Sequence, residues 1–215
     1  MSRVHIVVPS AADAPPPAVL PGFLTDLRPC APDPFVALAR AADLAGLSGV
    51  VVPFDPDGPE PLVTAAALLR VTRHVSVFAG IQPWIATPQY TAKLSATLQR
   101  FSGGRFGWYL ADDAESAAFT QTAREFWHSA EGLPDVLSEH TFPQLSVAGQ
   151  AGSALLDIAG LSADAVTALI AEHRSAGVEE FFLTVSHDPG EIYRIGEYVL
   201  PVLSQAQEKE PAHVG

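Results

Sequence analysis

The 215-residue chain has few of the residues that build metal centres or disulfide-bonded folds. Its single cysteine, Cys30, excludes an internal disulfide and a zinc site held by cysteine pairs. Its seven histidines include no HxH, HxxxH or HExxH spacing. We therefore expect no metal, and we expect a protein of the reducing cytoplasm.

Positive charge and long apolar segments are also scarce. The chain has 12 Lys and Arg against 24 Asp and Glu, a formal net charge of −12. Nucleic acids and anionic membranes are bound by surfaces with an excess of Lys and Arg, so neither is expected as a partner. The apolar run near the N-terminus, Val4 to Val8, is too short for a signal peptide core or a membrane span.

Three common catalytic or nucleotide-binding motifs are missing as well. The sequence has no GxGxxG, no GxxxxGK[ST] and no GxSxG. The glycine pair Gly103-Gly104 precedes a strand, so it is interpreted as the end of a helix. Asp55, Asp57 and Glu60 lack the spacing of a calcium loop and are interpreted as a solvated turn.

What the sequence does contain is a clear strand, helix, strand unit. Val75 to Ile81 is an apolar run, Thr87-Pro88 is a helix N-cap followed by proline, and Phe106 to Leu110 is a second apolar run after Gly103-Gly104. This pattern predicts a parallel sheet covered by helices. In such folds ligands bind at the carboxyl ends of the strands.

The rest of the chain repeats this alternation. Strands are expected at 4–8, 49–53, 75–81, 106–110, 144–148, 155–159 and 181–185, and helices at 35–46, 61–71, 88–102, 115–133 and 163–177. A complete eightfold barrel typically needs about 250 residues. Six or seven strands therefore predict an incomplete barrel or an open sheet, in one domain over 1–205 with a polar tail at 206–215. The long proline-rich loop at 11–34 lies where a lid would have to be.

The candidate site residues are polar or aromatic groups expected at strand ends: Ser10, Asp55, Gln82, Trp84, Asp112, Asp113, Ser186 and His187. The neighbouring carboxylates of Asp112 and Asp113 would raise each other's pKa in a dry pocket, although only one of them is expected to point inward. His187 is interpreted as a general base or ligand contact, or as an ordinary loop histidine. Ser186, His187 and Asp188 cannot form a triad because they are sequence neighbours.

Two blocks of the sequence resemble a known family. The run FVALARAADLAGLSGVVVP, the helix ending in RFSGGR and the segment YRIGE are similar to luciferase-like monooxygenases, most closely to the alkanesulfonate monooxygenase branch. The resemblance covers residues 34–113 and 162–203. It implies a TIM-type (β/α) barrel of the bacterial luciferase-like kind, shortened in this chain.

The resemblance also implies a cofactor and partners. Members of the family use reduced FMN, or in relatives a deazaflavin, supplied by a separate flavin reductase, and they oxidise a small organic molecule. They pair through the helices after the second and third strands, here 61–71 and 88–102. Helix 61–71 is apolar nearly all round, which independently favours a homodimer or a heterodimer with a related barrel.

Several positions depart from the family pattern. Ala11, Gly58 and Ser186 replace a family His, Cys and Tyr, Tyr109 replaces an Asn, and Asp112-Asp113 replaces Thr-Gly. The region between the fourth and seventh strands is cut to Ala114 to Ala159. In the family, the missing part carries the mobile lid, much of the flavin phosphate site and a catalytic His/Arg pair.

These departures leave three functional hypotheses. The first is a degenerate homologue that acts as a partner or accessory subunit in flavin-dependent oxidation. The second is an active monooxygenase that uses FMNH2. The third is a barrel repurposed for flavin-independent catalysis or ligand binding. Candidate catalytic residues are His187, Asp112, Asp113 and Tyr109, and candidate pocket residues are Ser10, Asp55, Gln82, Trp84 and Ser186.

Overall fold

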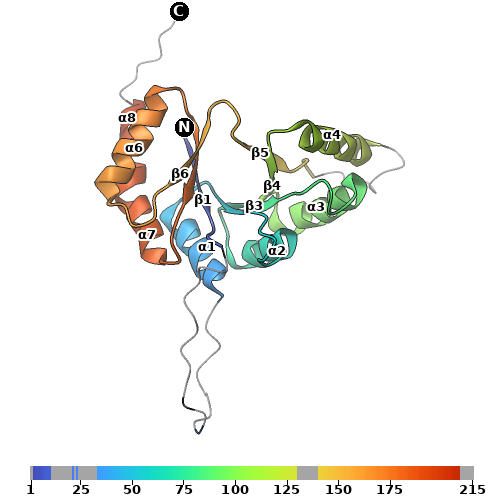
Figure 1. Ribbon diagram of the computed structural model, residues 1–215, viewed down its shortest axis with the longest axis horizontal. Coiled ribbons are helices and arrows are strands. Elements are labelled where there is room, and N and C mark those ends of the chain that lie inside the picture. Colours follow the sequence, from blue (N-terminus) through green and yellow to red (C-terminus); the bar gives the residue numbers. More distant parts are fainter. Residues whose placement is uncertain (1, 11–20, 22, 24–32, 130–139, 209–215) are drawn as a thin grey trace, which may run out of the picture.

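The computed structural model describes residues 2–10, 21, 23, 33–129 and 140–208. Seven parallel strands form one curved sheet in the order β5-β4-β3-β2-β1-β7-β6, an incomplete barrel covered by helices (Figure 1). The strands are β1 (Arg3–Val7), β2 (Gly49–Val52), β3 (Ser76–Gly80), β4 (Phe106–Ala111), β5 (Gln144–Ala148), β6 (Ser153–Asp157) and β7 (Glu180–Thr184). Each strand lies within two residues of its predicted bounds, so the α/β fold with a shortened parallel barrel is confirmed.

The helices lie on the outer face of the sheet. They are α1 (Pro34–Ala45), α2 (Pro61–Val71), α3 (Pro88–Ser102), α4 (Ala114–His128), α6 (Ala163–Ser175), α7 (Pro189–Arg194) and α8 (Leu200–Glu208). The helix ends follow the predicted caps. The Thr87 side chain accepts a hydrogen bond from the Tyr90 amide at the start of α3, and Gly103 ends that helix with a φ of 68°.

The RFSGGR motif has a structural role that sequence reasoning missed. The Arg105 guanidinium donates hydrogen bonds to the carbonyl oxygens of Leu69, Thr72 and Val75 and to the Thr72 hydroxyl, at 2.9 to 3.2 Å. These carbonyls lie at the carboxyl end of α2 and the start of β3, where a helix leaves acceptors without backbone partners. Arg105 therefore fixes α2 against β4.

Replacing Arg105 by lysine is expected to lower the free energy of unfolding by about 1 to 2 kcal/mol. A lysine carries the same charge but has three donors on one nitrogen, so it cannot reproduce the planar fork. Urea denaturation of Arg105→Lys measures the loss. Arg100→Lys, an exposed change in α3, is the matched control and should leave stability within experimental error; equal stability of both variants would contradict this role.

The YRIGE segment also serves packing. Residues Ile195–Val199 form one turn of π-helix between α7 and α8. A Cβ placed on Gly196 would lie 2.7 Å from the Ala45 Cβ and 2.8 Å from the Ala45 carbonyl oxygen at the end of α1. The glycine therefore allows this last helical region to lie directly against α1.

The inner face of the sheet is filled by aromatic side chains. Val7, Val51, Phe78 and Phe182 form a buried cluster, with Tyr109 packed against it. Phe78 lies between two strands that carry glycine: a Cβ at Gly49 would lie 2.8 Å from its ring and a Cβ at Gly107 would lie 2.3 Å from it. The missing side chains on β2 and β4 thus make room for the Phe78 ring.

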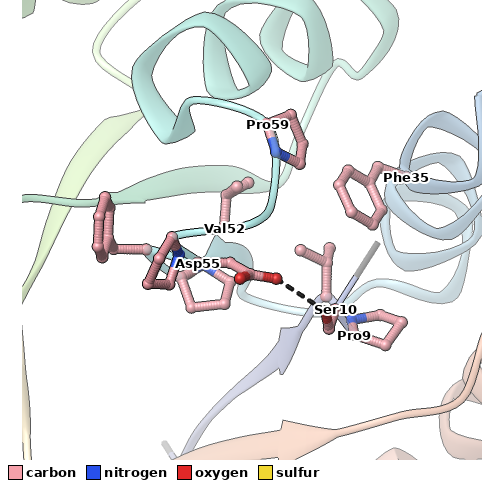
Figure 2. Close-up of a pocket in the computed structure, with 10 residues that line it drawn as sticks. Pro9, Ser10, Phe35, Val52, Asp55 and Pro59 are labelled. Carbon is pink, nitrogen blue, oxygen red and sulfur yellow. Dashed lines mark hydrogen bonds between the residues drawn. The ribbon is translucent and has the colours of Figure 1, made fainter. Parts of the chain in front are cut away.

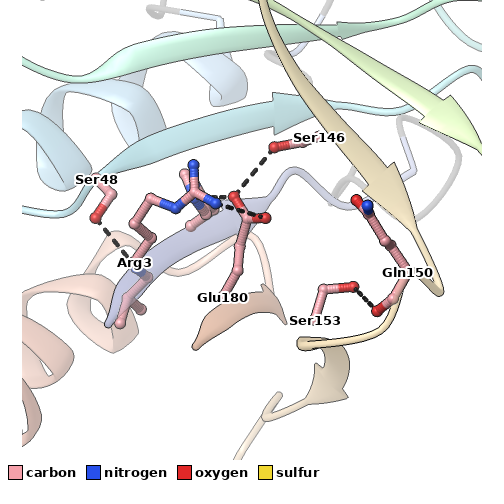
Figure 3. Close-up of polar contacts among 8 residues, drawn as sticks. Arg3, Ser48, Ser146, Gln150, Ser153 and Glu180 are labelled. Carbon is pink, nitrogen blue, oxygen red and sulfur yellow. Dashed lines mark hydrogen bonds and ion pairs between the residues drawn. The ribbon is translucent and has the colours of Figure 1, made fainter. Parts of the chain in front are cut away.

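A charged cluster lies next to these aromatic residues, toward the amino ends of the strands (Figure 3). The Glu180 carboxylate lies 3.1 Å from the His5 Nε2 and 3.2 Å from the Arg3 guanidinium, and it accepts a hydrogen bond from the Ser146 hydroxyl at 3.2 Å. The buried His5 ring stacks on Phe182. Since Ser146 belongs to β5 and Glu180 to β7, this contact crosses the interior between strands that are not neighbours in the sheet.

Some predictions concern residues outside the described part. They are the loop at 11–34 apart from its positions 21, 23, 33 and 34, with Ala11 and Cys30, the last residues of the expected helix 115–133, namely 130–133, and the end of the polar tail, 209–215. The expected tail began at 206, whereas α8 continues to Glu208. Among the described residues, no helix is long and apolar enough to cross a membrane.

Candidate functional site

A cavity of about 330 Å³ lies at the carboxyl ends of β1 and β2, as expected for a parallel sheet (Figure 2). Its walls are mostly apolar, with one carboxylate and one hydroxyl. It is lined by Val8, Pro9, Ser10, Phe35, Val52, Pro53, Phe54, Asp55, Pro56 and Pro59. Its volume lies at the low end of the range for ligand pockets, roughly 300 to 1,000 Å³, so it suits a small molecule.

Three predicted site residues meet beside this cavity. The Ser10 hydroxyl donates a hydrogen bond to the Asp55 Oδ2 at 2.7 Å, and the Asp57 amide donates to Oδ1 at 3.0 Å. The His187 Nε2 lies 3.1 Å from the Ser10 carbonyl oxygen. A carbonyl oxygen can only accept, so this contact is a hydrogen bond in the tautomer that carries its proton on Nε2. The loops after β1, β2 and β7 thus converge beside this cavity.

Two hydrogen bonds stabilise the charged form of the Asp55 carboxylate. The hydrogen bond from the Ser10 hydroxyl, followed by that from the Asp57 amide, lowers the pKa of the Asp55 carboxyl below its usual range, and partial burial opposes this only weakly. Asp55 is therefore an anion at neutral pH.

The loop that carries Ser186 and His187 is positioned by a carboxylate that the sequence analysis did not single out. Glu191 is buried, and its two oxygens accept hydrogen bonds from the Ser186 amide and the Gly160 amide, both at 2.8 Å. The Ser186 hydroxyl in turn accepts from the Asp188 amide at 3.1 Å. Ser186 is thus a loop-forming residue, and Glu191 joins the loops after β6 and β7.

The cavity lies on the helix side of the sheet. Val8, Val52 and Phe35 belong to the core between the sheet and the helices, whereas Val7 and Val51 belong to the inner cluster. Successive strand residues point to opposite faces, so this alternation separates the two environments. The cavity is therefore distinct from the inner face of the barrel, where Tyr109 lies.

Tyr109 lies on that inner face, in contact with the ring of Phe182 at a centroid distance of 5.4 Å. Burial raises the pKa of its phenol above the usual range, so it remains protonated near neutral pH. The aromatic side chains of β3, β4 and β7 thus fill the middle of the interior and extend toward the carboxyl end of β4.

Asp112 and Asp113 lie apart from Asp55, beside a second cavity of about 220 Å³ between β4, β5 and α4. The Asp113 carboxylate caps α4 by accepting a hydrogen bond from the Ser116 amide at 2.7 Å, and this bond lowers the pKa of Asp113. The pKa of Asp113 is thus lowered and not raised, because its carboxylate is engaged with the helix end.

Replacing Asp113 by alanine is expected to lower the free energy of unfolding by about 0.5 to 2 kcal/mol, because the first turn of α4 loses its cap. Asp112→Ala removes an exposed carboxylate at the neighbouring position and is expected to change stability by less than about 0.5 kcal/mol. Thermal denaturation at pH 7 compares the two variants. Equal losses would mean that the cap does not stabilise α4.

Gln82 and Trp84 lie in the loop after β3. The Gln82 carbonyl oxygen accepts a hydrogen bond from the Ile85 amide at 3.1 Å, which closes a turn. The Trp84 ring is 67% exposed and meets the Phe54 ring edge to face at 5.5 Å. Because Phe54 lines the first cavity, Trp84 lies next to that cavity rather than inside it.

Comparison with known proteins agrees with this architecture. A family model described as luciferase-like monooxygenase matches residues 5–138. Similar solved structures include riboflavin lyase (RcaE) with modified FMN and riboflavin, at TM-score 0.58 and 13% identity over 80% of this chain and 84% of that one. The coenzyme F420 dependent tetrahydromethanopterin reductase from Methanopyrus kandleri has a TM-score of 0.62 and 10% identity over 94% and 99%. DmoA from Hyphomicrobium sulfonivorans has a TM-score of 0.58 and 10% identity over 81% and 82%.

Proposed function

Because the chain belongs to the luciferase-like monooxygenase family, we propose that it acts in flavin-dependent oxidation as a partner or accessory barrel. In this role it pairs with a related barrel that binds the flavin. The alkanesulfonate branch remains a prediction. The observation that carries the proposal is Tyr109, which stands toward the carboxyl end of β4 where the family has an Asn, and whose ring packs against Phe182 and takes up room on the floor of the expected flavin pocket.

The charges at the carboxyl ends of the strands also support this proposal. In the described residues, the loops that follow the strands contain no lysine or arginine, and they carry Asp33, Asp55, Asp57, Glu60, Asp112, Asp113 and Asp188. A flavin phosphate needs cationic side chains or free backbone amides. The amides that begin α2, α4 and α7 are capped by Glu60, Asp113 and Asp188. The starts of α2, α4 and α7 therefore do not fit a flavin phosphate.

The surface of α2 and α3 supports the pairing. The two helices lie next to each other (Figure 1), and each exposes large apolar side chains. Val63 on α2 is 70% exposed and Phe101 on α3 is 81% exposed. Exposed large apolar side chains on neighbouring helices are suited to a contact with a second barrel.

The experiment that tests the proposal measures flavin binding and assembly together. The purified chain is titrated with FMN and with reduced FMN and followed by absorbance, alone and after co-expression with a related barrel. We expect no binding by the chain alone at micromolar flavin and flavin retained by the co-purified pair. A flavin complex of the chain alone with micromolar affinity would instead favour the active monooxygenase.

Pairing is tested by substitution on the same surface. Val63→Asp is expected to weaken pair formation at least about tenfold, because it places a charge in a buried apolar contact. Leu44→Asp changes a similarly exposed leucine on α1 and is the control. Light scattering over a concentration series gives the assembly state. Equal assembly of both variants would exclude α2 and α3 as the pairing surface.

A further inference from the structure

The cavity at the ends of β1 and β2 holds a negative charge that no described cation neutralises. The Asp55 carboxylate accepts one hydrogen bond on each oxygen, from Ser10 and from Asp57. Two carboxylate oxygens offer about four acceptor sites, so acceptor capacity remains on this carboxylate, which lines the cavity. Among the described residues, no lysine, arginine or histidine forms an ion pair with Asp55.

The helix ends beside the cavity do not offer an anion site. An uncapped helix N-terminus attracts anions through its free amides. Here the Asp33 carboxylate accepts from the Phe35 amide at 2.8 Å at the start of α1, and the Glu60 carboxylate accepts from the Val63 amide at 2.7 Å at the start of α2. Both caps use these amides and add negative charge near the cavity.

The remaining walls are apolar and partly aromatic. Phe35 and Phe54 line the cavity together with four prolines, and Val8 and Val52 add to its apolar lining. Figure 2 shows the Phe35 ring opposite Asp55 across this space. Aromatic faces attract organic cations, and rigid proline walls suit a compact apolar group.

We propose that this cavity binds a small organic cation, namely a protonated amine on an aromatic or branched aliphatic group. The ammonium lies against the Asp55 carboxylate, and the apolar group lies between Phe35, Phe54 and the prolines. The cavity is on the helix side of the sheet, separate from the inner face. Binding therefore needs neither a flavin nor a partner barrel, and the site goes beyond the proposed function.

The test uses three probes of nearly equal size, benzylammonium, benzyl alcohol and benzoate, titrated into the full chain at pH 7 and followed by calorimetry. Benzylammonium is expected to bind at least about tenfold more tightly than benzyl alcohol, and benzoate more weakly than either, because only the cation pairs with Asp55. Equal affinity of benzylammonium and benzyl alcohol, or tighter binding of benzoate, would overturn the proposal.

Two variants locate the preference. Asp55→Asn keeps the shape of the side chain and removes its charge, so the preference for benzylammonium over benzyl alcohol should fall below about threefold. Asp57→Asn removes a neighbouring carboxylate that does not line the cavity and should keep the preference. A tenfold preference that survives in Asp55→Asn would place the cation elsewhere.

A measurement on the unchanged protein covers the case in which Asp55→Asn does not fold. Backbone amide shifts are recorded by NMR during the benzylammonium titration. Ser10, Phe35 and Val52 come from three separate elements around the cavity, so their amides should shift together with one saturation curve. Shifts confined to other parts of the chain would overturn the proposal.

Discussion

Replacing Phe78 by alanine is expected to lower the free energy of unfolding by about 3 to 5 kcal/mol, because the variant loses a fully buried ring and leaves a space inside the barrel. Urea denaturation measures the loss. Phe23→Ala removes the same side chain from an 85% exposed position outside α2 and α3 and is expected to change stability by less than about 0.5 kcal/mol.

The glycine that faces Phe78 gives this prediction a second test. Gly107→Val alone should destabilise by about 1 to 3 kcal/mol, because its side chain would overlap the Phe78 ring. In the double variant with Phe78→Ala that overlap is gone, so the combined loss should be smaller than the sum of the two single losses. Strictly additive losses would show that the two positions do not share this space.

The local structure around Phe78 could be predicted, but its packing could not. The strand over Val75 to Ile81 and the helix from Thr87 to Gly103 follow from apolar runs and caps, which depend on neighbouring residues. The Phe78 ring needs a glycine on each of the two adjacent strands. This requirement depends on the register of β2, β3 and β4. The register pairs Phe78 with Val51 and Gly107, and no local pattern specifies it.

Replacing Glu180 by alanine is expected to lower the free energy of unfolding by about 3 kcal/mol at pH 7, the lower end of the range for a broken buried ion pair. We expect the lower end because the Arg3 side chain is about half exposed, so water can hydrate its guanidinium in the variant. A loss remains because the buried His5 and Ser146 side chains lack their acceptor. Glu179→Ala changes the exposed neighbouring glutamate and is the matched control. Equal effects at both positions would mean that the cluster contributes nothing.

The effect of Glu180 should depend on pH with a defined sign. Burial raises the pKa of its carboxyl, but the hydrogen bond and charge of His5, the charge of Arg3 and the Ser146 hydroxyl outweigh it, and the net pKa is lowered. A carboxyl group whose pKa is lowered in the folded state stabilises that state at pH values above its unfolded-state pKa of about 4.3. This stabilisation is lost as the pH falls through the folded-state pKa. The difference between wild type and Glu180→Ala should therefore be full at pH 7 and shrink below about pH 4.

The candidate site shows the same limit of sequence reasoning. Ser10, Asp55 and His187 were each predicted at the carboxyl end of a strand, and the structure brings them together. The position of the cavity on the helix side depends on which face of the sheet Val8 and Val52 point to. The sequence does not indicate this face, because buried strands that are apolar on both faces show no alternation of polar and apolar residues. The role of Asp113, in contrast, could have been predicted from the sequence. An aspartate directly before the helix Ala114–His128 is a recognisable N-cap, but it was interpreted as half of a carboxylate pair.

The position of β1 in the centre of the sheet also has a consequence for the order of folding. β1 pairs with β2 on one side and with β7 on the other, and the second pairing joins Arg3 to Glu180 and Val7 to Thr184. During synthesis, the β7 side of β1 therefore stays open until nearly all of the described chain has been made. Such distant pairing slows folding, and an open strand edge can pair with other chains. Nascent chains stalled before residue 180 are thus expected to depend on chaperones, whereas chains that include β7 are not.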